Sequence, residues 1–328
     1  MREVLQMSIQ NSNKSKVSAV LSSYMIYLIL VIMIVAISAL SGGRFLKITN
    51  ILNVLRQVTI TGTLAIGMTL VLITGGIDLS VGAIMAIAGV VSADLAHVDG
   101  GLPLIVSILA GIGIGLLFGA ISGWLVAWLN APAFIVTLGM TSIARGIAYI
   151  YTQGSPIINL SDSFLFIGKG TLLGIPFPVY LFAVFVLINV YILHFSKLGR
   201  YIYAIGNNES AAIASGVKTK IVKLFVYCNC GALAGFTGLL LASRTSSAVP
   251  NAASGYELDA IAAAVIGGTS TAGGVGSMFG TVVGILILGI LSNGLDLLNV
   301  SSYIQQVVKG VVIIAAVLLD VMNKKNAR

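Results

Sequence analysis

The chain has 328 residues, of which 58% are hydrophobic and 9% are charged, with a formal net charge of +8. A soluble domain usually carries about 25% charged residues, and even one of roughly 300 residues leaves about a quarter of its chain surface exposed. A soluble fold is therefore excluded, and we expect a membrane protein. The basic residues cluster in the tails and in one loop, which indicates membrane topology and no nucleic-acid partner.

Apolar stretches of membrane-spanning length follow one another along most of the chain. Residues 1–20 are polar and basic, and the apolar stretch after them has no small-residue cleavage site. We expect a cytoplasmic N-terminal tail there, followed by a retained first helix, with residues 21–328 forming one transmembrane domain. A span needs roughly 20 mostly apolar residues. The candidates are 22–40, 52–73, 79–96, 102–129, 134–151, 178–195, 222–242, 258–268, 278–291 and 303–319.

The predicted fold class is all-α, a polytopic integral membrane protein of about ten transmembrane helices. The eighth and ninth candidates are short and bounded by Gly, so we expect partial or broken helices there. The fourth candidate is long enough to tilt or kink.

The basic residues predict the orientation of the spans. They gather in the N-terminal tail, in the C-terminal "NKKNAR" and in the loop after the sixth span. Ten spans place all three on one side, which the positive-inside rule assigns to the cytoplasm. Arg44, Lys47 and Arg56 fall elsewhere and are a minority. Both termini are therefore expected in the cytoplasm.

Two stretches far apart in the chain share one pattern. "GGIDLSVGAIMAIAGV" from Gly75 and "SGYELDAIAAAVIGGT" from Ser254 both read Gly, a bulky residue, an acid and Leu, followed by small apolar residues. The acids precede the third and eighth spans, an odd offset that places them at opposite membrane faces and turns one copy upside down relative to the other. This arrangement predicts an inverted internal repeat, which is common in transporters. The alternative is chance recurrence in a Gly-rich chain.

Several ionisable residues lie within these apolar segments. A charge at the centre of a transmembrane helix costs about 2.5–3.5 kcal/mol on insertion scales, so each should face protein or water. A Gly precedes both Asp78 and Glu257, which favours helix starts where a carboxylate caps open N–H groups. For Arg145 and Lys309 we keep two readings open, a polar path or pairing with backbone groups at breaks. The candidates for a solute path or a helix break are Asp78, Glu257, Asp259, Phe134, Arg145 and Asn293.

The sequence contains no signature of a catalytic or cofactor site. No G-x-x-x-x-G-K-[ST] motif occurs, and no nucleophile, acid pair or metal set clusters at one depth, so an integral membrane enzyme is not supported. Cys228 and Cys230 lack further soft ligands for a zinc site. We expect no cofactor, and any ATP-driven transport needs another chain to hydrolyse ATP.

The longest basic loop, 196–221, includes "SKLGRYIYAIGNNESAAIASGVKTK". Asn208 is a potential helix cap, Glu and Ala follow it, and Gly216 is a potential helix stop. We expect a short helix along the cytoplasmic face. It is either an amphipathic helix held by lipid headgroups or a docking helix for a cytoplasmic partner.

This loop resembles the EAA-type coupling loop of ABC importer permeases, through Glu209, Ser210, Ala211 and Gly216. Ser210 stands where Ala is usual. Longer motifs are similar to the membrane subunits of bacterial monosaccharide importers, most closely those for ribose. They are "GMTLVLITGGIDLSVGA", "ARGIAYIYTQGSPI", "LGRYIYAIGNNESAA", "GYELDAIAAAVIGGTSTAGGVGS" and "LSNGLDLLNVSSYIQQVVKG". The similarity runs from about Asn50 to the C-terminus.

The resemblance implies partners and roles. In the bacterial inner membrane, two copies of the chain would surround one pathway, with cytoplasmic ATP-binding subunits beneath and a sugar-binding protein outside. Loops 153–176 and 243–255 would meet the binding protein, and small and hydroxyl-bearing residues would line the path. The residues expected to couple to the ATPase are Gly199, Arg200, Asn208, Glu209, Ala211 and Gly216.

Two rival functions remain open at this point. One is a permease of the same kind for xylose, galactose or a furanose signal molecule, since selectivity rests largely on the receptor. The other is an ion-coupled secondary transporter that uses Asp78 or Asp259 as a proton or sodium site.

Overall fold

The computed structural model describes residues 26–326, with side chains described as far as residue 318. The tail expected at 1–20 lies outside these residues, as does the start of the span expected at 22–40. The described chain is helical apart from one two-stranded antiparallel hairpin, so the all-α class is confirmed.

Six described helices are long and apolar enough to cross a membrane. They are α2 (Ile48–Ile73), α4 (Leu104–Trp128), α5 (Ala133–Thr152), α7 (Phe177–Val190) with its π-helical continuation η2 (Tyr191–Phe195), α10 (Thr219–Thr245) and α12 (Met278–Leu297). Shorter apolar helices are Ile26–Leu40, α3 (Val81–Asp94) and Ser302–Leu318, which belongs to α13 (Ser302–Asn326). The remaining elements are η1 (Arg44–Leu46), α6 (Asp162–Lys169), β1 (Thr171–Leu172), β2 (Ile175–Pro176), α8 (Lys197–Asn207), α9 (Glu209–Ala214) and α11 (Tyr256–Ile266).

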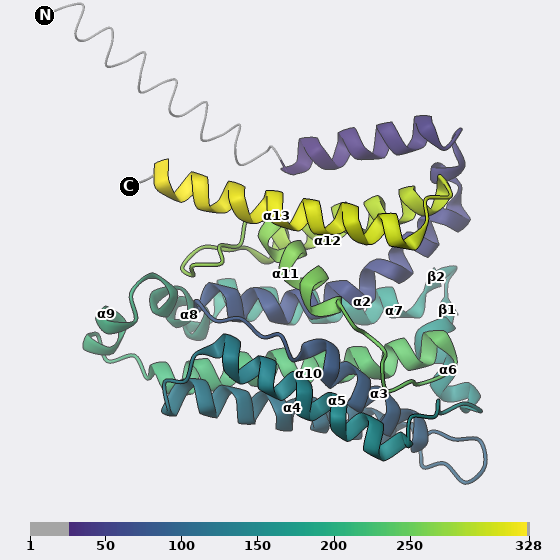
Figure 1. Ribbon diagram of the computed structural model, residues 1–328, viewed down its shortest axis with the longest axis horizontal. Coiled ribbons are helices and arrows are strands. Elements are labelled where there is room, and N and C mark those ends of the chain that lie inside the picture. Colours follow the sequence, from purple (N-terminus) through teal and green to yellow (C-terminus); the bar gives the residue numbers. More distant parts are fainter. Residues whose placement is uncertain (1–25, 327–328) are drawn as a thin grey trace, which may run out of the picture.

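The long helices run roughly parallel to one axis and give the molecule two ends (Figure 1). One end carries α8 and α9, and we call it the coupling end after the role that the sequence resemblance implies for loop 196–221. The opposite end carries α6, β1 and β2, and we call it the loop end. The length and apolar composition of the described helices indicate a polytopic membrane protein, as the sequence predicted.

Close helix packing depends on glycine at the contact between α4 and α10. A Cβ at Gly115 would overlap the backbone of Gly231, and a Cβ at Gly231 would overlap that of Gly115. One turn along, a Cβ at Gly235 would overlap the carbonyl oxygen of Gly111, and a Cβ at Gly111 would overlap the Ser92 hydroxyl of α3. Without side chains at these positions the two backbones can approach closely, which is the usual role of small residues between membrane helices.

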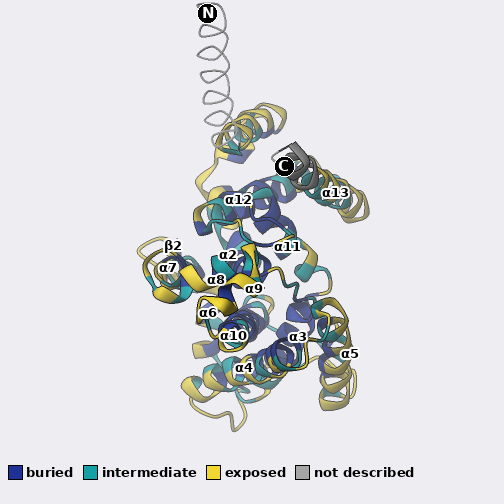
Figure 2. Ribbon diagram, turned by 90° about the vertical axis from the view of Figure 1, so that its left-hand side faces the viewer, coloured by how far each residue is buried: buried dark blue, intermediate teal, exposed yellow. Residues whose placement is uncertain are grey.

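Helices α2 and α10 form the centre of the bundle. In an apolar 18-residue stretch of α2, 83% of the stretch is buried inside the structure. The same share is only 22% in α5 and in α7 with η2. Figure 2 shows α5 and α13 on one side of the molecule and α7 on the other, with α3 and α11 between α5 and α13. The exposed sides of α5, α7 and α13 are therefore available to lipid or to another chain.

Two short helices, α3 and α11, differ most from ordinary spans. They contain 14 and 11 residues, which gives lengths of about 21 and 17 Å, less than the roughly 30 Å hydrocarbon core. The sequence predicted a partial helix at 258–268, and α11 fits that expectation. It also predicted a short ninth helix, 278–291, which is wrong, because α12 has 20 residues.

Tertiary contacts explain why α12 continues through polar residues. Asn293 exchanges two side-chain hydrogen bonds of 2.9 Å with Asn50 of α2. Gly294 lies against Ile37, where a Cβ would overlap the Ile37 side chain. The helix therefore buries residues that resemble a stop signal in the sequence.

Candidate translocation and coupling sites

The starts of α3 and α11 lie side by side inside the bundle. A Cβ at Gly82, in the first turn of α3, would overlap Glu257 Oε2 and the carbonyl oxygen of Ala253. From this junction α3 runs toward the loop end, where His97 forms a β-bridge with Leu160. The helix α11 runs the other way, because the segment after it meets α8. The two helices thus begin together and diverge.

Both acids of the repeated motif accept backbone hydrogen bonds beside these helix starts. Asp78 is fully buried, and its Oδ1 accepts hydrogen bonds from the Ser80 N–H at 2.9 Å and the Ser80 hydroxyl at 2.5 Å. Glu257 Oε1 accepts one from the Gly255 N–H at 3.1 Å. Each carboxylate therefore lies at a helix start, as the sequence predicted, but it binds the N–H of the residue before the helix and not the open N–H groups of the first turn. The junction also brings Glu257 against α3, whereas the sequence interpretation put the two acids at opposite membrane faces.

Threonines on one face of α5 contact the non-helical segment between α2 and α3. The hydroxyls of Thr137 and Thr141 lie 3.4 and 2.9 Å from the carbonyl oxygens of Ile77 and Leu79. An irregular backbone inside a membrane protein has to find partners in other helices, because hydrocarbon offers none. The α5 hydroxyls supply them here.

Arg145, one further turn along the same face of α5, holds the other non-helical segment. Its Nη1 donates to the carbonyl oxygens of Pro250 and Ala252 at 2.8 and 2.7 Å. These carbonyls belong to segment 246–255, which connects α10 to α11. Of the two readings left open for Arg145, the structure supports pairing with backbone groups at a break.

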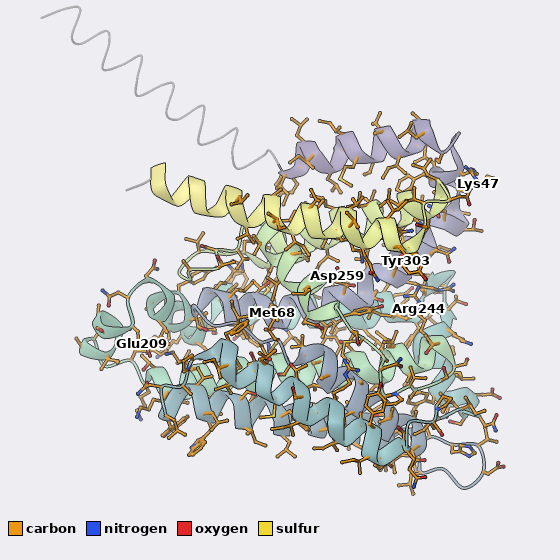
Figure 3. All side chains as sticks on the ribbon, viewed as in Figure 1. Lys47, Met68, Glu209, Arg244, Asp259 and Tyr303 are labelled. Atoms are coloured by element: carbon orange, nitrogen blue, oxygen red, sulfur yellow. The ribbon has the colours of Figure 1, made fainter. Side chains whose placement is uncertain are left out.

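An ion pair joins α11 to α13. Lys309 Nζ lies 2.9 Å from Asp259 Oδ2, with side chains 28% and 20% exposed. Figure 3 labels Asp259 near the middle of the bundle, far from Glu209 at the coupling end. Lys309 therefore also has a partner. Among the other path candidates, Phe134 is 53% exposed on α5, and Asn293 is buried in its pair with Asn50.

Two cavities border the start of α11, and one of them also borders segment 246–255. The outer cavity, about 280 Å³, lies between α3, α10 and this segment. The polar cavity, about 90 Å³, lies between α2, α11, α12 and α13. Tyr256 lines both. The side chains of Asp259 and Lys309 border only the second.

At the coupling end, two short helices form where the sequence predicted one. Ser196 Oγ accepts the Gly199 N–H at 3.2 Å and starts α8. Asn208 Oδ1 accepts the Ala211 N–H at 3.0 Å and starts α9, as predicted. Gly216 follows α9 with a φ of 83°, so the predicted stop is confirmed.

The turn after α9 has the hydrogen bonds of a Schellman motif. The Val217 N–H donates to the Ala212 carbonyl at 3.0 Å and the Gly216 N–H to the Ile213 carbonyl at 2.9 Å. Gly216 has nothing within 4 Å of a Cβ position, so its backbone conformation alone favours glycine. Gly199 instead is enclosed, since a Cβ would overlap the carbonyl of Leu193.

Glu209 attaches α9 to the start of α10. The Lys223 ammonium lies 2.7 Å from each carboxylate oxygen of Glu209, with side-chain exposures of 16% and 41%. The same pair borders a cavity of about 280 Å³ together with Gly75, Asn130 and Tyr227. This cavity opens at the coupling end beside the segment between α2 and α3.

The helix α8 contacts the end of α2 and the segment before α12. A Cβ at Gly206 would overlap the Ile73 carbonyl and the backbone of Gly274. The Tyr203 hydroxyl donates to the Gly276 carbonyl at 2.7 Å, and burial raises the pKa of this phenol. A displacement of α8 would therefore move several membrane helices.

The outer face of these two helices remains exposed. Arg200 and Ala211 are exposed, and so is Ile213, whose side chain is 56% accessible. No group of three or more metal-ligating residues occurs in the described part of the chain.

Comparisons with known proteins identify the family. The profile of a family described as "Branched-chain amino acid transport system / permease component" matches residues 50–317. The ribose import permease protein of Escherichia coli (strain K12) is 47% identical over 285 residues, 86% of this chain and 88% of the relative.

The chain belongs to this permease family. The ribose import permease of Bacillus subtilis (strain 168) is 46% identical over 86% of this chain and 87% of the relative. The xylose transport system permease of Haemophilus influenzae (strain ATCC 51907 / DSM 11121 / KW20 / Rd) is 37% identical over 86% of this chain and 92% of the relative. No solved structure matches the permease.

Some residues of these sites were not singled out from the sequence of the permease. The sequence singles out Arg145 but not Thr137 and Thr141, although the spacing of four places all three on one helix face. Lys223 lies just after the basic loop 196–221 and is not among the predicted site residues. No neighbouring sequence pattern distinguishes Gly82 from the rest of the 38 glycines in the chain.

Proposed function

We propose that this permease is the membrane-spanning subunit of an ATP-driven importer for D-ribose in the bacterial inner membrane. Relatives named ribose import permeases are 45–47% identical over 84–86% of the chain and support this substrate. An extracytoplasmic binding protein delivers the sugar, and a separate cytoplasmic subunit hydrolyses ATP. The permease itself is not an enzyme.

The coupling end is the docking site of the ATP-binding subunit. The contact residues are on the exposed outer face of α8 and α9, including Arg200 and Ala211. Asn208 and Gly216 shape α9, and Gly199 lets η2 turn tightly into α8. When ATP binding closes the partner subunits, α8 pushes on Ile73 and Gly276, and Glu209 pulls on Lys223. This geometry is the observation that carries the ATP-driven mechanism, because the moving unit contacts α2, α10 and the segment before α12.

The bundle is an inverted repeat within ten transmembrane helices. The packing of the two short helices supports this proposal. Helix α3 packs against α10, and α11 packs against α2. In the same way, α3 contacts the two helices that follow it, α4 and α5, and α11 contacts the two that follow it, α12 and α13. Two half-helices that meet at their starts fit the transporter architecture in which breaks lie near the membrane midplane.

The termini of the permease are cytoplasmic. The basic residues of the tails support this orientation, because it places them on the same side as the basic loop. In Figure 1, α13 runs from the loop end back toward the coupling end. The loop end then faces outward, toward the sugar-binding protein.

Two copies of the permease enclose one pathway. The helices α5 and α13 lie on the same side of the molecule and expose apolar residues, among them Phe134, Ile147, Tyr303 and Val307. Sugar would pass near the helix-start junction, where Arg145, Asp78 and Glu257 organise the irregular backbone.

The sugar-binding protein docks on loops 153–176 and 243–255 at the loop end. These two loops are joined by reciprocal backbone hydrogen bonds between Ile157 and Ala248, at 2.8 and 2.9 Å. Docking of the sugar-binding protein on either loop would therefore displace segment 246–255 and, through it, the start of α11.

Competition uptake tests the substrate. The permease, its ATP-binding subunit and its receptor are reconstituted together, and uptake of labelled D-ribose is measured against unlabelled D-xylose and D-allose, since a xylose permease and a D-allose permease are relatives at 37% and 40% identity. Ribose should be the strongest competitor. Stronger competition by D-xylose or D-allose would assign the permease to that sugar instead.

A further inference from the structure

We propose that the outer cavity is a weak binding subsite for a neutral monosaccharide within each copy of the permease. This inference rests on the proposed function and adds a place, a lining and a positioning residue for the sugar. The cavity is about 280 Å³, close to the lower end of the roughly 300–1,000 Å³ range of drug-sized ligand pockets. A pentose is smaller than a typical drug.

The lining of the outer cavity suits an uncharged polyol. Its residues include five alanines and two glycines, and Thr245, Ser247 and Tyr256 carry hydroxyl groups, while none of the described lining residues is charged. Small residues leave room for a ring, hydroxyls exchange hydrogen bonds with the sugar, and an aromatic ring packs against its C–H face. A charged solute would find no counter-ion in this cavity.

Weak binding follows from the same lining. Only a few side-chain hydrogen bonds are available, and each contributes little once the lost bonds to water are counted. We expect a dissociation constant on the order of 1 mM. Such an affinity lets the sugar leave again, which transport requires, because the binding protein performs the capture.

Arg145 is the positioning residue of this subsite. It does not line the cavity, but Ala252 does, and Arg145 holds the Ala252 carbonyl at 2.7 Å. Ala253, another lining residue, has a left-handed φ of 59° and places its carbonyl against Gly82. The wall formed by segment 246–255 is thus fixed from α5 and from α3.

Tyr256 gives the subsite a route onward. It lines the outer cavity and the polar cavity beside the Asp259–Lys309 ion pair. Rotation of this one side chain at the start of α11 would connect the two spaces. Movement of α11, driven from the coupling end, would then release the sugar from the subsite.

Thiol protection tests the subsite directly. The complete importer is prepared in nanodiscs with Cys228→Ala and Cys230→Ala, and Ser247→Cys is introduced into the cavity wall. Its reaction with a membrane-impermeant methanethiosulfonate is timed with and without D-ribose. The control is Asn251→Cys, which is exposed on the same segment and does not line the cavity.

We expect D-ribose to slow the reaction at Ser247→Cys by about tenfold at about ten times the half-protecting concentration, and to leave Asn251→Cys unchanged. Equal rates at Ser247→Cys with and without D-ribose, in an importer that still accumulates D-ribose, would overturn the subsite but not the proposed function. If Ser247→Cys prevents assembly, Thr245→Cys replaces it, with the same expected protection. Absence of any sugar uptake by the parent importer would instead refute the proposed function.

Discussion

Arg145 Nη1 lies 2.7 Å from the carbonyl oxygen of Ala252, a residue 107 positions further along the chain. A second hydrogen bond, to the Pro250 carbonyl at 2.8 Å, fixes the same segment. One cation of α5 thus holds the irregular backbone that leads into α11. This contact links the loop end to the helix-start junction.

Removing this cation should loosen segment 246–255. A hydrogen bond to a charged group contributes about 1.5–3 kcal/mol, so Arg145→Gln should reduce ribose uptake strongly. It should also speed thiol modification at Asn251→Cys on the same segment. Arg145→Lys, which keeps the charge but loses the planar guanidinium, should give intermediate values for both. Unchanged labelling in Arg145→Gln would show that Arg145 does not hold the segment.

Gly82→Ala should disrupt the junction between α3 and α11. A Cβ there would overlap Glu257 Oε2 and the Ala253 carbonyl, and overpacking of this kind costs about 1–3 kcal/mol. The matched control is Gly113→Ala on α4, where nothing lies within 4 Å of the new Cβ. Thermal unfolding of the purified permease should shift downward for Gly82→Ala and not for Gly113→Ala. Equal melting temperatures would contradict the close approach of the two helices.

The Glu209–Lys223 pair should matter more for coupling than for stability. Because both side chains are partly exposed, the pair contributes only about 0.5–1 kcal/mol. Glu209→Lys should nevertheless lower ribose uptake per ATP hydrolysed, since α9 loses its attachment to α10. The exchanged pair Glu209→Lys with Lys223→Glu should recover part of this ratio. If the double variant imports no more ribose per ATP hydrolysed than Glu209→Lys alone, the ion pair is not the coupling contact.

Asp78→Asn separates a hydrogen-bonding role at the helix start from a role in proton or ion transfer. The carboxamide keeps an oxygen that can accept the Ser80 N–H, so uptake should persist close to the unmodified rate. Asp78→Ala removes the acceptor and should destabilise the start of α3 by about 1 kcal/mol. Loss of uptake in Asp78→Asn, with normal assembly with the ATP-binding subunit, would favour a direct role in the path.

The features that sequence predicted well are local ones. Asn208 and Gly216 delimit α9 because caps and stops depend on a few neighbouring residues. Asp78 and Glu257 were predictable as helix-start residues for the same reason. The family was visible in motifs that run through most of the chain, and the comparisons confirm it.

The features that escaped prediction depend on backbone atoms far away in the chain. Thr141 binds a carbonyl group that the sequence does not indicate. For Arg145 the sequence offers pairing with backbone groups as one reading, but it does not identify Pro250 and Ala252 as the partners, because a carbonyl carries no sequence signature. The meeting of Gly82 with Glu257 requires knowing how far each short helix reaches into the bundle. Asn293 looked like a helix break until its partner Asn50 was known.

ATP-dependent accumulation of D-ribose tests the central claim most directly. Proteoliposomes would contain the permease with its ATP-binding subunit. ATP would be on the side that the proposed orientation assigns to the cytoplasm, and the receptor loaded with labelled D-ribose would be on the other side. We predict accumulation of D-ribose against its gradient that needs ATP and receptor and persists when ionophores abolish proton and sodium gradients. Accumulation driven by an ion gradient in the absence of the ATP-binding subunit, or no accumulation of any sugar with all components present, would contradict the account.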